Sequence, residues 1–210
     1  MGVLTNEQKV KILSEIVAIP SVNDNELAVA QYLEQWLNRY DIDTHIDYIS
    51  GQRANLIATI GSGKPVVAVS GHMDVVNEGN HDDWTSPPFE LTERNGHLYG
   101  RGAADMKSGL AALVIAMIEI KASGQLKNGT IKLLATAGEE MEQAGSEQLY
   151  RKGYMDDVDA LVIAEPSYPS IVYAHKGSMD YKITSKGKAA HSSVPVVGFN
   201  AIKQLIQFIQ

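Results

Sequence analysis

Four short segments of this 210-residue chain place histidine or carboxylate side chains beside glycine or proline, where strand patterns end or a helix pattern begins. They are residues 70–74, 99–109, 137–140 and 164–167. Because the chain contains no cysteine, any metal ion must be held by imidazole and carboxylate groups. The four segments are therefore candidate parts of a metal site.

The first segment, Ser-Gly-His-Met-Asp at 70–74, ends an apolar strand pattern. In extended geometry His72 and Asp74 share one face, because they are two residues apart. His72 can then ligate a metal while Asp74 fixes the tautomer and orientation of the ring. The alternative is an ordinary polar loop after a strand, and so short a motif does not decide between the two.

The second segment places Asp105 directly before an apolar run at 106–120. An isolated aspartate there usually caps the helix. In the functional alternative its carboxylate bridges two metal ions, on a loop that Gly102 and Gly109 make conformationally permissive.

The third segment puts Glu139 and Glu140 after the apolar strand pattern 130–136. Adjacent carboxylates at the end of a core strand repel each other unless a cation compensates them. One can be a metal ligand and the other a general base. A solvated acidic turn, with Glu142 close by, is the alternative.

The fourth segment ends another strand pattern with Glu165, followed by Pro166. Ligands of open α/β sheets bind outside the carboxyl ends of the strands, so the recurrence of acids and histidine at such ends carries more weight than any one motif. Taken together, the four segments predict a metal site.

The surrounding pattern predicts an α/β fold with a mixed, mostly parallel sheet and helices on both faces. Thr5 is expected to cap a first helix that Pro20 ends, and Asp24 or Asn25 to cap a second. The expected helices and strands, in addition to these two helices, are a buried helix at 106–120, strands at 44–49 and 55–60, and buried strands at 65–70, 130–136 and 160–164.

The pattern changes near residue 177. Residues 178–185 alternate like a half-exposed strand, and 201–210 read as a helix. One strand and one helix cannot bury a core. We therefore expect a domain at 1–177 that carries the metal site, and at 178–210 the truncated start of a second domain.

Composition narrows the class of partner. Lys and Arg number 18 against 25 Asp and Glu, a net charge of -7 that argues against nucleic-acid binding. The longest apolar run, 110–118, is too short to span a bilayer, and residues 1–11 lack an apolar signal core. These features predict a cytoplasmic protein, without membrane partners, that acts on a small molecule.

In this order and spacing the motifs are similar to those of a family of zinc-dependent amidohydrolases, the M20-like enzymes. It includes succinyl-diaminopimelate desuccinylase, acetylornithine deacetylase, aminoacylase and a carboxypeptidase. The matching motifs are Ser70-Gly71-His72-Met73-Asp74, Gly100-Arg101-Gly102, Asp105-Met106-Lys107, Gly138-Glu139-Glu140, Glu165-Pro166 and Ala190-His191-Ser192-Ser193 with Pro195.

The stretch 163–195 looks most like the desuccinylase members. The resemblance thus implies a zinc-exopeptidase-like fold and hydrolysis of an N-acyl amino acid. The expected substrate is N-succinyl-LL-2,6-diaminopimelate, cleaved to succinate and LL-2,6-diaminopimelate in lysine biosynthesis. Acetylornithine deacetylase, aminoacylase, dipeptidase and a non-catalytic module of the same fold remain alternatives.

The resemblance also implies two zinc ions per full-length subunit, for which Co²⁺ can substitute. His72 and Glu165 would hold one ion, Glu140 would help to hold the second, and Asp105 would bridge both. Asp74 would support the ring of His72. A histidine from near the C-terminus of longer relatives has no counterpart here, so we expect this chain to be inactive and to bind at most one zinc ion tightly.

Three further features follow from the resemblance. Glu139 would be the general base. The peptide between Asp105 and Met106 would be cis. In the family a lid domain also forms the homodimer, and a histidine of this domain reaches a neighbouring active site. His191 would be that histidine and would bind substrate. The alternative is that His191 is an ordinary loop histidine.

Overall fold

The computed structural model describes residues 2–168, 170–177, 179 and 181–210. Its main feature is a five-stranded sheet in the order β1-β2-β6-β3-β7. The strands are β1 Asp43–Ser50, β2 Arg53–Ser62, β3 Val66–His72, β6 Gly129–Thr136 and β7 Ala160–Ile163. β3 pairs in parallel with both β6 and β7, whereas β2 is antiparallel to both β1 and β6. The sheet is therefore mixed, with only β2 reversed, as the sequence predicted.

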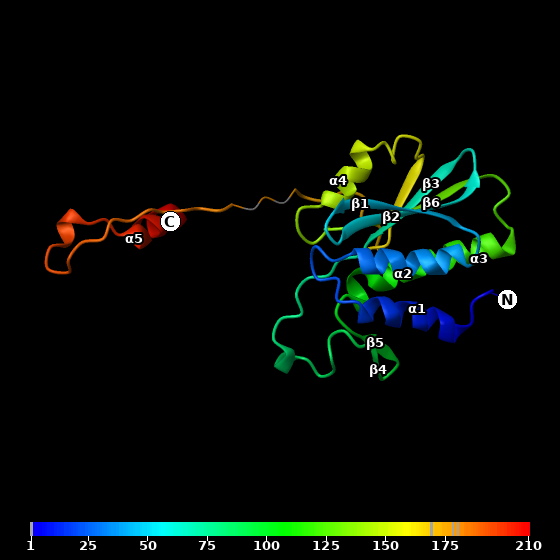
Figure 1. The fold of residues 1–210 in the computed structure, drawn as a ribbon, viewed down its shortest axis with the longest axis horizontal. Helices are drawn as coiled ribbons and strands as arrows, with labels where there is room; N and C mark the ends of the chain where they lie inside the picture. The colour runs from blue at the N-terminus through cyan, green and yellow to red at the C-terminus, as the bar shows by residue number, and fades with distance from the viewer. Residues whose placement is uncertain (1, 169, 178, 180) are drawn as a thin grey trace. The chain divides into compact units, whose positions relative to one another are not determined.

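Helices cover both faces of this sheet (Figure 1). They are α1 Asn6–Ala18, α2 Leu27–Asn38, α3 Ser108–Ser123 and α4 Ala144–Arg151. Leu56 of β2 and Leu133 of β6 point into the large core shared with α1, α2 and α3, while Ile57 and Leu134 point to the other face. There they pack with Leu149 of α4. This alternation is the two-residue period of strands buried on both faces.

The helix ends agree only in part with the sequence. Thr5 forms the expected cap of α1, because its hydroxyl accepts a hydrogen bond from the backbone N–H of Gln8 in a capping box. The expected capping residue of α2, Asp24 or Asn25, was wrong. Glu26 occupies the cap position without a side-chain hydrogen bond, and Asp24 instead adopts a left-handed backbone with φ 63°.

The buried helix expected from residue 106 begins later, at Ser108. An irregular turn, η2 Ala103–Lys107, precedes it, because Asp105 and Met106 have non-helical backbone angles. Asp105 is consequently not an N-cap. A small hairpin of β4 Thr92–Arg94 and β5 His97–Tyr99 and the short helix η1 His81–Asp83 lie between β3 and this turn in the chain.

β7 was expected to be buried, and this was wrong. All four of its residues are exposed, and Val162 retains 54% of its accessible surface. β7 pairs only with β3 and forms the edge of the sheet in the part of the chain that is described. The apolar pattern identified the strand correctly but could not show whether its faces are covered.

The contacts of the chain divide it into two compact units, 1–168 and 169–210. The second contains the short helix η3 Pro195–Val197, helix α5 Ala201–Ile209 and an isolated bridge between Lys188 and Phe199. Of the strand expected at 178–185, residues 178 and 180 lie outside the described residues, and the others form no strand. The domain boundary expected after residue 177 stays a prediction.

No helix in the described residues is both long enough and apolar enough to cross a membrane.

Candidate metal centre

Three of the four chemically distinctive segments meet because their strands are neighbours. His72, the last residue of β3, pairs with Thr136 of β6, and Ser70 pairs with Ile163 of β7. The segments after these strands therefore leave the sheet on the same side, at the carboxyl ends of the strands. Open α/β sheets bind their ligands at this carboxyl edge.

The fourth segment reaches this edge through the turn before α3. The backbone N–H of His72 lies 3.2 Å from the sulfur of Met106, and a Cβ atom on Gly71 would lie 2.5 Å from the terminal methyl of Met106. The small residue at 71 thus allows the turn to approach the end of β3. The peptide between Asp105 and Met106 is cis, as the resemblance implied.

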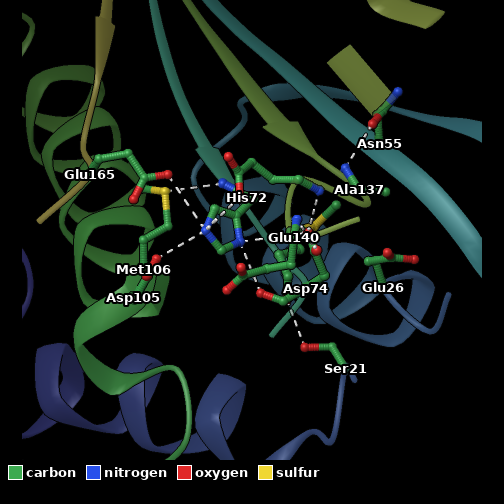
Figure 2. Close-up of polar contacts among 12 residues, drawn as sticks. Ser21, Glu26, Asn55, His72, Asp74, Asp105, Met106, Ala137, Glu140 and Glu165 are labelled. Atoms are coloured by element: carbon green, nitrogen blue, oxygen red, sulfur yellow. Dashed lines mark hydrogen bonds and ion pairs between the residues drawn. The ribbon is translucent and has the colours of Figure 1, made fainter. Parts of the chain in front are cut away.

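Carboxylates gather around the imidazole of His72, and Figure 2 shows those of Asp105, Glu140 and Glu165. Its Nε2 atom lies 3.2 Å from Asp105 Oδ1, 3.5 Å from Glu165 Oε1 and 4.0 Å from Glu139 Oε2. Glu140 completes the group, since His72, Asp105 and Glu140 each offer a ligand atom within 4.8 Å of the others. All four residues predicted as ligands therefore lie together, with the predicted base beside them.

Asp74 connects the histidine to the glutamate loop. The Nδ1 atom of His72 is 2.9 Å from the backbone carbonyl oxygen of Asp74 and 3.6 Å from its Oδ1 atom. The same carboxylate accepts hydrogen bonds from the backbone N–H groups of Glu139, at 3.1 Å, and Glu140, at 3.0 Å. Asp74 thus turns the other nitrogen of the ring toward Asp105 and also fixes the loop that carries the two glutamates.

The pKa values reflect this crowding. Burial alone would lower the pKa of His72, but the hydrogen bond and charge of Asp74, with the charge of Glu165, raise it to about 9. Burial raises the pKa of Glu165 to about 7, and the negative charges of Asp105 and Glu139 act in the same direction. Burial and the charge of Asp105 also raise the pKa of Glu140.

The donor set suits a divalent cation. It combines one imidazole nitrogen with carboxylate oxygens, the ligands that zinc takes when thiolates are absent. Burial, with a smaller contribution from the neighbouring negative charges, raises the pKa of Glu140 and Glu165 more than the charge of His72 lowers it. A bound cation would favour their ionised forms and so oppose this rise.

His191, the predicted substrate-binding residue, belongs to the second compact unit and is exposed. Its Nδ1 atom lies 2.8 Å from the hydroxyl of Ser193. Its role stays a prediction.

Sequence reasoning missed two residues that support the glutamate loop. Arg53 and Asn55 are buried polar side chains at the start of β2 and contact residues 137–145. A signal was present, because charged and amide side chains are unusual in a strand that is otherwise buried and apolar.

Comparison with known protein families decides the class of the chain. Residues 68–209, more than half of the chain, match the sequence model described as Peptidase family M20/M25/M40. The chain belongs to this peptidase family. The expected family resemblance is thereby confirmed, and the matched range includes every residue predicted for the site.

Individual members of the family show both similarity and a difference in length. A protein of Staphylococcus epidermidis named probable succinyl-diaminopimelate desuccinylase is 56% identical over 209 residues, which are 100% of this chain and 52% of that protein. The chain thus spans about half the length of the curated relatives it matches.

Solved structures agree on the fold. Human carnosine dipeptidase 1 superposes with a TM-score of 0.62 at 29% identity, over 75% of this chain and 38% of that one. The Bacillus subtilis YXEP protein, described as a dinuclear metal-binding M20 peptidase, has a TM-score of 0.58 at 18% identity, over 75% and 42% of the chains.

Proposed function

We propose that the protein to which this chain corresponds is a zinc-dependent amidohydrolase that removes the succinyl group from N-succinyl-LL-2,6-diaminopimelate, a step of lysine biosynthesis. The observation that carries the proposal is the meeting of His72, Asp105, Glu140 and Glu165 at one edge of the sheet, with Glu139 beside them. The substrate is inferred from the staphylococcal relatives, which share 54–56% identity with this chain.

In this proposal His72, Asp105 and Glu165 would hold one zinc ion. Glu140 would help to hold a second zinc ion, and Asp105 would be a ligand of both. Co²⁺ is a possible substitute. When bound, these ions supply Lewis acidity, which polarises the amide carbonyl and makes water easier to deprotonate. Asp74 keeps the ligating nitrogen of His72 directed at the site through its contacts with the other ring nitrogen.

Glu139 is the proposed general base. Its side chain is 47% exposed and reaches to 4.0 Å from His72 Nε2, so it is open to both water and substrate. It would take a proton from water as the water oxygen attacks the amide carbon, and would give that proton to the leaving amine when the carbon–nitrogen bond breaks. The products are a carboxylate and a free amino group.

The remaining features of the proposal concern the rest of the protein. His191 would bind substrate, the second unit would be the start of a lid through which full-length subunits dimerise, and the enzyme would act in the cytoplasm without nucleic-acid or membrane partners. The 210-residue chain alone would bind at most one zinc ion tightly and would not turn over. Two tightly bound zinc ions with substantial turnover by this chain would refute that last statement.

A substrate panel tests the proposal. The full-length protein, supplied with zinc, should hydrolyse N-succinyl-LL-2,6-diaminopimelate with a higher kcat/KM than N-acetylornithine, other N-acetyl amino acids or dipeptides. Dipeptidase is the second candidate, because human carnosine dipeptidase 1 shares 29% identity over 75% of the chain. Metal-dependent turnover of any of these substrates excludes a non-catalytic module.

A further inference from the structure

We propose that Arg53 and Asn55 are positioning residues that hold the loop 137–145, and thereby the side chains of Glu139 and Glu140. Both lie at the start of β2, two residues apart and therefore on one face of the strand. The consequence of these contacts for catalysis rests on the function proposed above.

Asn55 joins the two ends of the loop. Its side chain is fully buried, and its Oδ1 accepts a hydrogen bond from the backbone N–H of Ala137 at 3.1 Å (Figure 2). Its Nδ2 donates to the carbonyl oxygen of Gly145 at 3.1 Å. A Cβ atom on Gly145 would lie 2.4 Å from Asn55 Oδ1. The absence of a side chain at 145 therefore permits this close approach.

Arg53 holds the middle of the loop. Its Nη1 atom lies 2.7 Å from Glu142 Oε1 and 3.0 Å from Asp24 Oδ1, and its side chain is only 9% exposed. A Cβ atom on Gly138 would lie 2.0 Å from Nη2, so the guanidinium rests against the residue that precedes Glu139. Gly138 has φ +71°, a conformation that glycine adopts without strain.

The carboxylate of Glu26 lies beside the guanidinium of Arg53. Glu26 is fully buried, and neither of its oxygen atoms has a hydrogen-bond partner among the described residues. Its Oε2 atom is 3.9 Å from Nε of Arg53. Replacing Arg53 with a neutral side chain would leave this buried acid near Asp24 and Glu142 without a compensating charge.

The two glutamates therefore lie between three points of support. Asp74 binds their backbone N–H groups, Asn55 closes the ends of the loop, and Arg53 binds the side chain of Glu142 and packs on Gly138. Small displacements of a base or ligand reduce catalysis strongly, so loosening the two β2 contacts should affect chemistry more than substrate binding.

The test compares Arg53→Met and Asn55→Ser with the control Gln148→Leu. Gln148 donates to Asp47 Oδ2 at 2.7 Å, and Asp47 lies 3.5 Å from Asn55 Nδ2, so the control disturbs the same network away from the loop. Amide hydrogen exchange of residues 137–143 is measured in the metal-free 210-residue chain. The affinity for the second zinc ion, to which Glu140 would contribute, is measured in the full-length protein by competition with a chromophoric chelator.

Both test variants should speed exchange of the loop amides about 10-fold or more beyond any change in the core amides of β3 and β6. In the full-length enzyme they should also weaken binding of the second zinc ion about 10-fold to 100-fold and lower kcat with little change in KM. The control should match wild type within about 2-fold in zinc affinity. Arg53→Lys, which keeps the charge, should recover most of the loss.

Three results would overturn the proposal. The first is unchanged loop exchange in both variants, and the second is an equal effect of the control on zinc binding. The third is an equal loss of protection in the loop and in the core, which would assign a purely structural role. If wild type binds no zinc, the proposed function fails, yet the exchange data still decide whether Arg53 and Asn55 hold the loop.

Discussion

Replacing Asp74 by asparagine should separate the charge of this carboxylate from its shape. Asp74 is fully buried and accepts two backbone N–H groups, from Glu139 and Glu140, one on each oxygen. Asparagine has only one oxygen, so one of these N–H groups would face an NH₂ group. A lost hydrogen bond to a charged group costs about 1.5 to 3 kcal/mol, and breaking a buried charge pair costs about 3 to 5 kcal/mol.

We therefore expect Asp74→Asn to lower the free energy of unfolding of the metal-free chain by about 3 kcal/mol, which lowers Tm by about 6 to 12 °C for a domain of this size. Thermal unfolding followed by circular dichroism measures this. Asp82→Asn, at an exposed position, is the matched control and should leave Tm within about 1 °C.

The difference between wild type and Asp74→Asn should depend on pH. Because the folded pKa of His72 is raised to about 9 from an ordinary value of 6.5, the stabilisation from charged His72 is complete below pH 6.5 and is lost as the pH rises through about 9. The folded pKa of Asp74 is lowered, so its contribution is lost at acid pH instead. A difference in Tm below 2 °C near pH 6, or one that grows above pH 9, would refute the reasoning.

Three further outcomes are expected. Zinc at about 100 times its Kd should stabilise the 210-residue chain by about 2.7 kcal/mol, and EDTA should reverse this; a Tm unaffected by zinc would count against a metal site. Glu139→Gln in the full-length enzyme should lower kcat at least about 100-fold with unchanged zinc content, and near-normal turnover would exclude Glu139 as the base. Leu33→Ala, in the fully buried core, should cost about 2 to 5 kcal/mol of stability with unchanged zinc affinity; a loss below about 1 kcal/mol would show that the core repacks.

The sequence predicted those features that depend on short-range pattern and on strand ends. His72 and Glu165 could be placed at one edge because parallel strands bring their carboxyl ends together, and this needed only the order of apolar runs. Thr5 was recognisable as a cap because it precedes an apolar pattern of helical spacing that Pro20 ends. These inferences use only local spacing and the order of the apolar runs along the chain.

Other features depend on tertiary contacts. The position of Asp105 in an irregular turn rather than at a helix cap arises from packing of Met106 against the end of β3, which no local pattern specifies. The exposure of β7 depends on what covers an edge strand. The roles of Arg53 and Asn55 became visible only once β2 was seen to lie beside the loop that follows β6.

The central claim is that His72, Asp105, Glu140 and Glu165 form a zinc site, and anomalous diffraction at the zinc edge from crystals of the zinc-loaded chain tests it most directly. The account predicts an anomalous peak about 2.0 to 2.2 Å from His72 Nε2 and from carboxylate oxygens of Asp105 and Glu165. Saturating zinc that gives no peak at this edge of the sheet, or peaks only at other histidines, would contradict it.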